Sequence, residues 1–240
     1  MKKVIALLLV SCLCLGMATA MTACGKKEEP KESEIDEAPE AVAGGWTVNG
    51  EYGEAELPEE AKAAFDKALE GYTGVGFTPV AYLGSQVVAG TNYAFLCKST
   101  VVTADPITNL KVVTVYNDLE GNATIKDVID VNVADYTQGD GVTFNVDDAV
   151  GAYTFENAVG CGLDADVQAK FDKAFEGMTG VGYTPLALLG TQVVAGINYA
   201  VLCQARSVGM TSAKAALAVV VIYADLQDGA EITNITGFEF

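Results

Sequence analysis

The 240-residue chain contains no histidine. Histidine is the usual general base at neutral pH, the partner that activates many serine and cysteine nucleophiles, and the commonest metal ligand. Its absence excludes histidine-dependent triads and imidazole metal sites. We therefore expect a protein that is not an enzyme, with no catalytic residue, no bound metal and no cofactor. An enzyme that works with carboxylates alone is the remaining catalytic alternative.

Basic residues are also few, because 14 lysines and arginines stand against 32 aspartates and glutamates, and the formal net charge is −18. Nucleic acid would be repelled by this charge, so we expect no nucleic-acid partner. The acids include adjacent pairs such as Asp147 and Asp148, but no loop shows the alternating ligand spacing of a calcium site. Carboxylates this abundant are typical of a solvated surface.

The first 23 residues have the composition of a signal peptide, since two lysines precede a mainly apolar stretch, Val4 to Ala20, that ends in small residues. The sequence Met21-Thr22-Ala23-Cys24-Gly25 then resembles the lipobox of bacterial lipoproteins. This resemblance implies a lipid on Cys24 that holds the chain in the cell envelope, on the outer face of a bacterial membrane. The alternative is an uncleaved transmembrane helix, because the stretch is just long enough to cross a bilayer. Residues 24–43 are rich in acids, and we expect a disordered tether there.

Beyond residue 43 the sequence repeats itself. Phe65-Asp66-Lys67-Ala68 recurs 106 positions later as Phe171-Asp172-Lys173-Ala174, and Gln86 to Gly90 recurs at the same offset as Gln192 to Gly196. A repeat this long is a whole domain, so each copy is expected to close its own core. We place the domains at residues 44–134 and 151–240, with a linker over 135–150.

Each copy is predicted to contain one amphipathic helix followed by strands. In the first copy Pro58 opens the helix, apolar side chains recur every three or four residues, and Gly71 ends it. In the second copy Asp164 is the candidate N-cap and Gly177 the terminator. We expect short strands before the helices at 46–48 and 153–155, and β-rich runs in the first copy at 77–88, 91–103, 111–116 and 124–133. These patterns predict an α+β fold class of two tandem domains, each an antiparallel β-sheet packed on one α-helix.

One predicted hairpin in each copy has an apolar tip. The tip reads Gln-Val-Val-Ala-Gly in both copies, whereas hairpin tips usually hold Gly, Asn, Asp or Ser, which tolerate turn dihedrals and water. Valines at a solvent-exposed corner give up hydrophobic burial unless a partner covers them. The two tips are therefore candidate contact surfaces for another protein.

The segment Gln86-Val87-Val88-Ala89-Gly90-Thr91-Asn92-Tyr93 resembles the first binding hairpin of the cystatins and stefins, inhibitors of papain-like cysteine proteases. A glycine segment, a helix and this hairpin also follow one another in a family-like order in both copies. The resemblance implies two cystatin-like domains, each with a wedge that fills a protease cleft without being cut. The residues it implies for the two wedges are Gly44, Gly45, Gln86, Val87, Val88, Ala89 and Gly90, and Gly151, Gln192, Val193, Val194, Ala195 and Gly196.

The second binding hairpin of that family usually carries Pro-Trp, which this sequence lacks. The corresponding turns read Asp118-Leu119-Glu120-Gly121 and Asp225-Leu226-Gln227-Asp228, so Leu119 and Leu226 are the candidate replacements. The expected partner is a papain-like cysteine protease or another protein. Two alternatives remain: a non-inhibitory envelope or adhesion module that keeps only the fold, and tips that are ordinary strand ends copied by duplication.

Three of the six cysteines, Cys97, Cys161 and Cys203, lie beyond Cys24 and cannot all pair with one another. Cys97 and Cys203 occupy equivalent positions in predicted strands, where we expect buried thiols. A disulfide between the two domains is the alternative. Cys161 stands between two glycines, has no counterpart in the first copy, and has no predicted role.

Overall fold

The computed structural model describes residues 44–48, 57–102, 107–137, 153–154, 162–208 and 215–240. The predicted signal peptide, Cys24 and the predicted tether lie outside these residues, and so do Gly151, Cys161 and most of the predicted linker. All described residues belong to the unit Pro39–Phe240. Within the described residues no helix is both long enough and apolar enough to cross a membrane.

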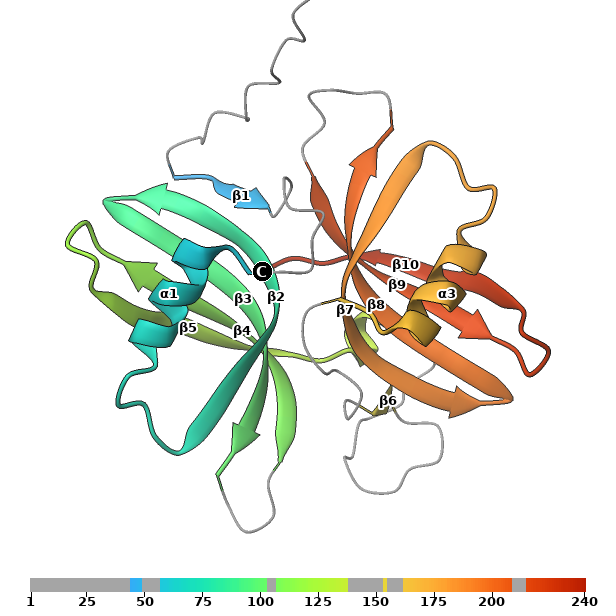
Figure 1. Cartoon of the computed structure of the whole chain (residues 1–240), viewed down its shortest axis with the longest axis horizontal. Helices are drawn as coiled ribbons and strands as arrows, with labels where there is room; N and C mark the ends of the chain where they lie inside the picture. Colours follow the sequence, from blue (N-terminus) through green and yellow to red (C-terminus); the bar gives the residue numbers. More distant parts are fainter. Residues whose placement is uncertain (1–43, 49–56, 103–106, 138–152, 155–161, 209–214) are drawn as a thin grey trace, which may run out of the picture. The chain divides into compact units, whose positions relative to one another are not determined.

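The strands form two antiparallel five-stranded sheets (Figure 1). The first has the order β1-β2-β3-β4-β5 and the second the order β10-β9-β8-β7-β6, so the two copies of the repeat give the same topology. The first sheet contains β1 (Trp46–Val48), β2 (Val75–Val88), β3 (Gly90–Val101), β4 (Thr108–Asn117) and β5 (Ala123–Val131). The second contains β6 (Tyr153–Thr154), β7 (Val181–Val194), β8 (Gly196–Ser207), β9 (Ala216–Ala224) and β10 (Ala230–Gly237). The expected strands of the first copy are thus confirmed to within a few residues.

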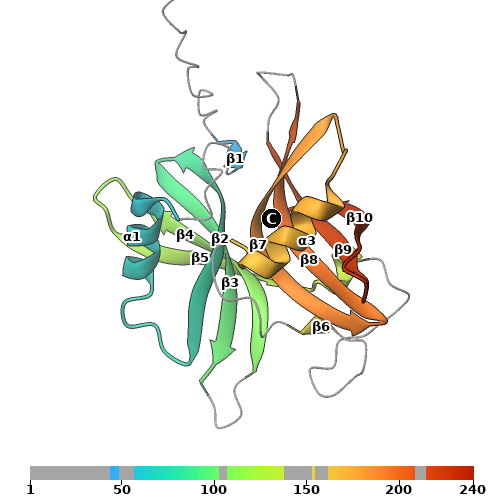
Figure 2. The same cartoon turned by 45° about the vertical axis from the view of Figure 1, so that its right-hand side comes forward.

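The described residues also contain three helices: α1 (Glu59–Ala68), α2 (Ala134–Thr137) and α3 (Ala165–Ala174). Helix α1 packs on β4 and β5, and α3 packs on β9 and β10 (Figure 2). Asp164 is the N-cap of α3 as predicted, because its Oδ1 accepts hydrogen bonds from the backbone N–H groups of Asp166 at 3.0 Å and Val167 at 2.9 Å. Pro58 is the last residue before α1, where we had expected the first residue of the helix.

The apolar face of each long helix is buried against its own sheet. Ala61, Ala64 and Phe65 of α1 pack on Phe95, and the Phe65 and Phe95 rings meet edge to face with centroids 4.8 Å apart. Val167 and Phe171 of α3 occupy the equivalent cluster in the second copy. The spacing of apolar residues that predicted the two helices therefore also identified the faces that they bury.

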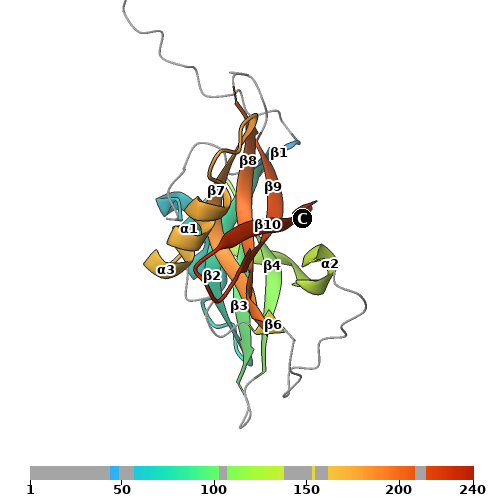
Figure 3. The same cartoon turned by 90° about the vertical axis from the view of Figure 1, so that its right-hand side faces the viewer.

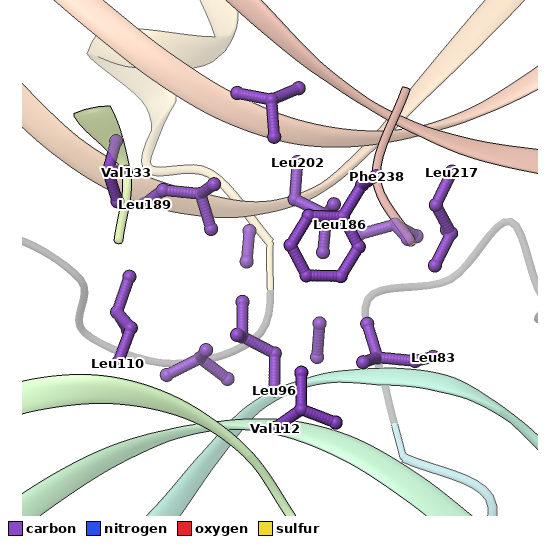
Figure 4. Packing of buried hydrophobic residues seen from close by; sticks show 14 of the residues in the cluster. Leu83, Leu96, Leu110, Val112, Val133, Leu186, Leu189, Leu202, Leu217 and Phe238 are labelled. Atoms are coloured by element: carbon purple, nitrogen blue, oxygen red, sulfur yellow. The ribbon is translucent and has the colours of Figure 1, made fainter. Parts of the chain in front are cut away.

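A third apolar cluster joins the two sheets (Figure 4). It draws equivalent leucines from both copies, and Figure 4 shows their side chains pointing toward one another from the strands of the two sheets. Its leucines are Leu83, Leu96, Leu110, Leu186, Leu189, Leu202 and Leu217, and its buried aromatic residues are Tyr153 and Phe238. The face of each sheet that does not carry the long helix is thus buried in a core that both copies share.

The predicted α+β fold class is therefore wrong. The described chain is mostly β, with two five-stranded sheets and only short helices, and it does not form two tandem helix-on-sheet domains of the cystatin type. The physical reason lies in the middle strands: Asn92 to Cys97 of β3 are buried at six consecutive positions, which requires cover on both faces of the sheet. The helix covers one face with a cluster that belongs to its own copy, and the core shared by both copies covers the other face.

Short segments at the end of each copy extend this shared core. Helix α2 contacts β9 and β10 of the second sheet (Figure 3), and Asn234 Nδ2 donates a hydrogen bond of 2.8 Å to the Tyr136 carbonyl. The Tyr136 ring lies 5.2 Å from that of Phe238. The part of the chain that follows the first sheet is therefore packed against the second.

Candidate functional site

The tips of the β2–β3 and β7–β8 hairpins are exposed. Val88 pairs with Gly90 and Val194 pairs with Gly196, so a single alanine forms the apex of each hairpin. The relative exposure is 41% for Val87, 42% for Val88, 67% for Val193 and 42% for Val194. The described chain does not cover these valines, which is the condition on which the predicted contact surface depends.

Each apex is held by the neighbouring strand. The Tyr116 hydroxyl donates a 2.5 Å hydrogen bond to the Ala89 carbonyl, and the Tyr223 hydroxyl donates a 2.6 Å bond to the Ala195 carbonyl. No role was predicted for these tyrosines from the sequence. Their occurrence in both copies next to the predicted turn was the signal that could have identified them. The bonds hold the apex of each apolar tip against the neighbouring strand.

Glycine is required after each apex because the next strand approaches closely. Gly90 has φ +119° and Gly196 has φ +139°, both in the region that favours glycine. A Cβ at Gly90 would lie 2.4 Å from the Asn117 carbonyl oxygen, and one at Gly196 would lie 2.3 Å from that of Ala224. These two predicted site residues are buried, so they shape the tip and do not form its outer surface.

The segment that begins the first sheet lies beside the first tip. The Gly44 N–H donates a 3.0 Å hydrogen bond to the Val87 carbonyl, and Trp46 of β1 pairs with Gln86 of β2. Gly44 is exposed and Gly45 is partly exposed. In the second copy Tyr153 pairs with Gln192, but Gly151 lies outside the described residues. The structure thus brings the predicted glycine segment and the predicted hairpin together in the first copy.

The β4–β5 turn lies at the same end of the first sheet as the β2–β3 tip, because Asn117 pairs with Thr91. Leu119 in this turn is 84% exposed, and Leu226 in the β9–β10 turn is 79% exposed. The Asp118 carboxylate accepts hydrogen bonds from the Asn122 side chain and from backbone N–H groups of Asn122 and Glu120. These bonds lower the pKa of Asp118 and order the turn. A fixed turn therefore presents Leu119 to solvent.

A lysine of the repeated Phe-Asp-Lys-Ala motif links each long helix to this second turn. Lys67 Nζ donates a 2.6 Å hydrogen bond to the Gly121 carbonyl, and Lys173 Nζ donates a 2.5 Å bond to the Asp228 carbonyl. In the second copy Lys170 also pairs with the Asp228 carboxylate at 2.9 Å, which raises the pKa of Lys170 and lowers that of Asp228. The sequence showed the repetition of this lysine but not its role.

Gly44 with Gly45, the β2–β3 tip and the β4–β5 turn together form an exposed surface at one end of the first sheet. The described residues include no cluster of acids and cysteines that could hold a metal ion. Cys97 and Cys203 are thiols with 0% exposure, in β3 and β8, away from the hairpin tips. Burial raises the pKa of the Cys203 thiol, so this side chain is kept in its neutral, unreactive form.

Comparison with known proteins adds no relative: no protein-family model matches the chain, and no curated protein matches it in sequence. The resemblance of the Gln-Val-Val-Ala-Gly segments to the cystatin hairpin therefore stays a prediction that depends on the residues themselves.

Proposed function

We propose that this chain binds and inhibits papain-like cysteine proteases by inserting its exposed Gln-Val-Val-Ala-Gly tips into the substrate cleft. The observation that carries the proposal is the exposure of Val87, Val88, Val193 and Val194 at two apices whose carbonyls are held by tyrosines. The proposal uses the hairpins and their surroundings, and it does not require separate cystatin-like domains.

Binding would follow from burial of the valines against the walls of a cleft. Removing a half-exposed valine from water contributes about 1 kcal/mol, and the ordered apex loses little conformational entropy when it binds. Gly44 with Gly45 and Leu119 extend the contact on either side of the first tip. Because no catalytic group is offered, the tip acts by occupying the cleft.

We also propose that the mature chain is a lipoprotein anchored through Cys24 to the outer face of a bacterial membrane. The lipobox-like sequence around Cys24 supports the anchor, and the acidic residues 24–43 support a tether that keeps the sheets away from the lipid headgroups. From this position the tips would meet proteases outside the cell.

A second candidate function is a non-inhibitory envelope or adhesion module that binds another protein by its sheets or tips. Two observations favour it. Acids flank Leu119 where the inhibitor family carries Pro-Trp, and the shared core differs from the fold that the family resemblance implied. In this candidate, binding through an exposed surface other than the tips stays intact when the tips are substituted.

The test is titration of the chain without its first 24 residues against papain and a cathepsin. We expect inhibition that is lost when Val88→Asp and Val194→Asp are combined, because a carboxylate at each apex would have to be desolvated in the cleft. Thr124→Asp, on the exposed side of β5, is the control and should leave inhibition unchanged. Absence of inhibition by the wild-type chain at high micromolar concentration would remove the proposal for these targets.

A further inference from the structure

Gln86, which the cystatin resemblance assigns to protease contact, is tied at both ends of its side-chain amide to other parts of the chain. Its Nε2 donates a 3.0 Å hydrogen bond to the Gly44 carbonyl, and its Oε1 accepts a 2.6 Å bond from Nδ2 of Asn92. Asn92 lies directly opposite Gln86 in the β2–β3 pairing, and Trp46 lies opposite it on the β1 side. Gln86 therefore spans from β3 to the start of β1.

The orientation of the two amides follows from the Gly44 carbonyl, which can only accept. The Gln86 NH₂ group must face it, so Oε1 is turned toward β3 and Asn92 must donate. The Asn92 carbonyl oxygen is left facing a buried position, where it has no hydrogen-bond partner among the described residues. Asn92 itself is 0% exposed. A buried acceptor without a partner is unfavourable. The bond from Gln86 to Gly44 imposes this orientation of the Asn92 amide all the same.

The same pair occurs in the second copy. Asn198 Nδ2 donates a 2.7 Å hydrogen bond to Gln192 Oε1, and Gln192 pairs in register with Tyr153 of β6. The first strand of each sheet, β1 or β6, is very short, and in the first copy the Gln86 bond to Gly44 adds to the backbone bond from the Gly44 N–H to the Val87 carbonyl. The hydrogen bond between glutamine and asparagine thus occurs beside the tip in both copies.

From this geometry we infer that Gln86 is a positioning residue that locks the glycine segment at 44–45 against the first hairpin, with Asn92 fixing the Gln86 amide. The consequence of this positioning rests on the proposed function. The glycine segment and the first tip would enter a protease cleft as one preorganised surface. Glutamine is required because one end of the side chain must donate and the other must accept. A glutamate would still accept from Asn92 but would set a carboxylate oxygen against the Gly44 carbonyl.

Trp46 supplies a direct readout, because it is the only tryptophan in the chain and lies in β1 opposite Gln86. The experiment measures acrylamide quenching of Trp46 in the chain without its first 24 residues. For Gln86→Glu at pH 7 we expect quenching to rise by about twofold as β1 loosens. The matched control is Gln192→Glu, which makes the same change in the second copy and should leave Trp46 quenching unchanged.

The pH profile separates a hydrogen-bond role from general damage to the sheet. Below about pH 4 the introduced carboxyl group becomes protonated and regains a donor for the Gly44 carbonyl. Quenching in Gln86→Glu should then return toward the wild-type value. Gln86→Met keeps the side-chain length but has no donor, so its quenching should stay high at every pH. Unchanged Trp46 quenching in Gln86→Glu at pH 7 would overturn the positioning role.

Binding is tested in a background where Val193→Asp and Val194→Asp disable the second tip. There we expect Gln86→Glu to weaken papain inhibition by about tenfold, since the free segment must be ordered on binding. Equal inhibition despite a released Trp46 would overturn the link between positioning and binding. If the wild-type chain does not inhibit while Trp46 still responds, the protease proposal fails and the lock between Gln86 and Gly44 stands.

Discussion

The indole of Trp46 and the ring of Phe240 meet edge to face, with centroids 5.2 Å apart and planes at 73°. Trp46 belongs to the first strand of the first sheet, and Phe240 follows the last strand of the second. The contact therefore connects the end of the chain to the strand that carries the glycine segment beside the first tip. A residue of one copy thereby supports the candidate binding surface of the other.

Phe240→Ala should loosen β1 with little effect on global stability. The aromatic pair contributes about 0.5–1.5 kcal/mol, and its loss acts on a three-residue strand at the edge of the sheet. We expect a red shift of Trp46 emission and a decrease of no more than about 6 °C in the midpoint of thermal unfolding. Glu239→Ala is the adjacent control. Unaltered Trp46 emission in Phe240→Ala would show that the ring contact does not hold β1.

The local elements could be predicted from the sequence because local signals specify them. Asp164 and Gly177 marked the limits of α3, and the alternation and turn residues located the strands of the first copy. The sequence pattern did not reveal what covers the face of each sheet that lies opposite the helix. In the structure the other copy covers it. The run from Asn92 to Cys97 mixes polar and apolar residues, and periodicity alone does not show whether one face of such a strand is buried or both.

Leu96→Ala tests the shared core. Leu96 is fully buried in the cluster between the sheets, so its truncation should cost about 2–5 kcal/mol. Because both copies contribute to that cluster, we expect a single unfolding transition in wild type and a single, lower one in the variant, measured by calorimetry. Leu202→Ala, the equivalent change in the second sheet, is the matched comparison. Two separate transitions, with only one moved by each variant, would contradict a common core.

The candidate site was predictable in its residues but not in their roles. The apolar tips were recognised because valines are unusual at a turn, and the structure exposes them. Gln86 and Gly90 belonged to the same motif, yet one is bonded within the chain and the other is buried against β4. Tyr116 recurs in the second copy as Tyr223, but the recurrence alone does not show that its hydroxyl reaches a carbonyl on another strand. Which motif residues face outward is decided by tertiary contacts.

Gly90→Ala should distort the first tip more than a matched change in the neighbouring turn. The new Cβ would lie 2.4 Å from the Asn117 oxygen at a φ of +119°, whereas at Gly121, with φ +79°, nothing lies within 4 Å. We expect a loss of about 2–4 kcal/mol for Gly90→Ala and about 1 kcal/mol for Gly121→Ala, measured by urea unfolding. Inhibition by the first tip should fall with Gly90→Ala. Equal costs for the two variants would show that the close approach to β4 is relieved without strain.

The Cys203 thiol should make stability fall in alkaline solution. Burial raises its pKa in the folded chain above the unfolded value of about 8.5, so the folded state keeps the proton while the unfolded state loses it. Its contribution is fully present below about pH 8.5 and is lost as the pH rises from there, by at most about 1.4 kcal/mol per pH unit.

Cys203→Ala should unfold more easily at pH 7, because it leaves a small cavity, but its stability should decline less steeply between pH 8.5 and 10. A parallel decline in both proteins would mean that the thiol is not protected from ionisation. Ellman's reagent gives an independent check: the native chain should leave Cys203 unmodified at pH 8, and denatured chain should react within minutes.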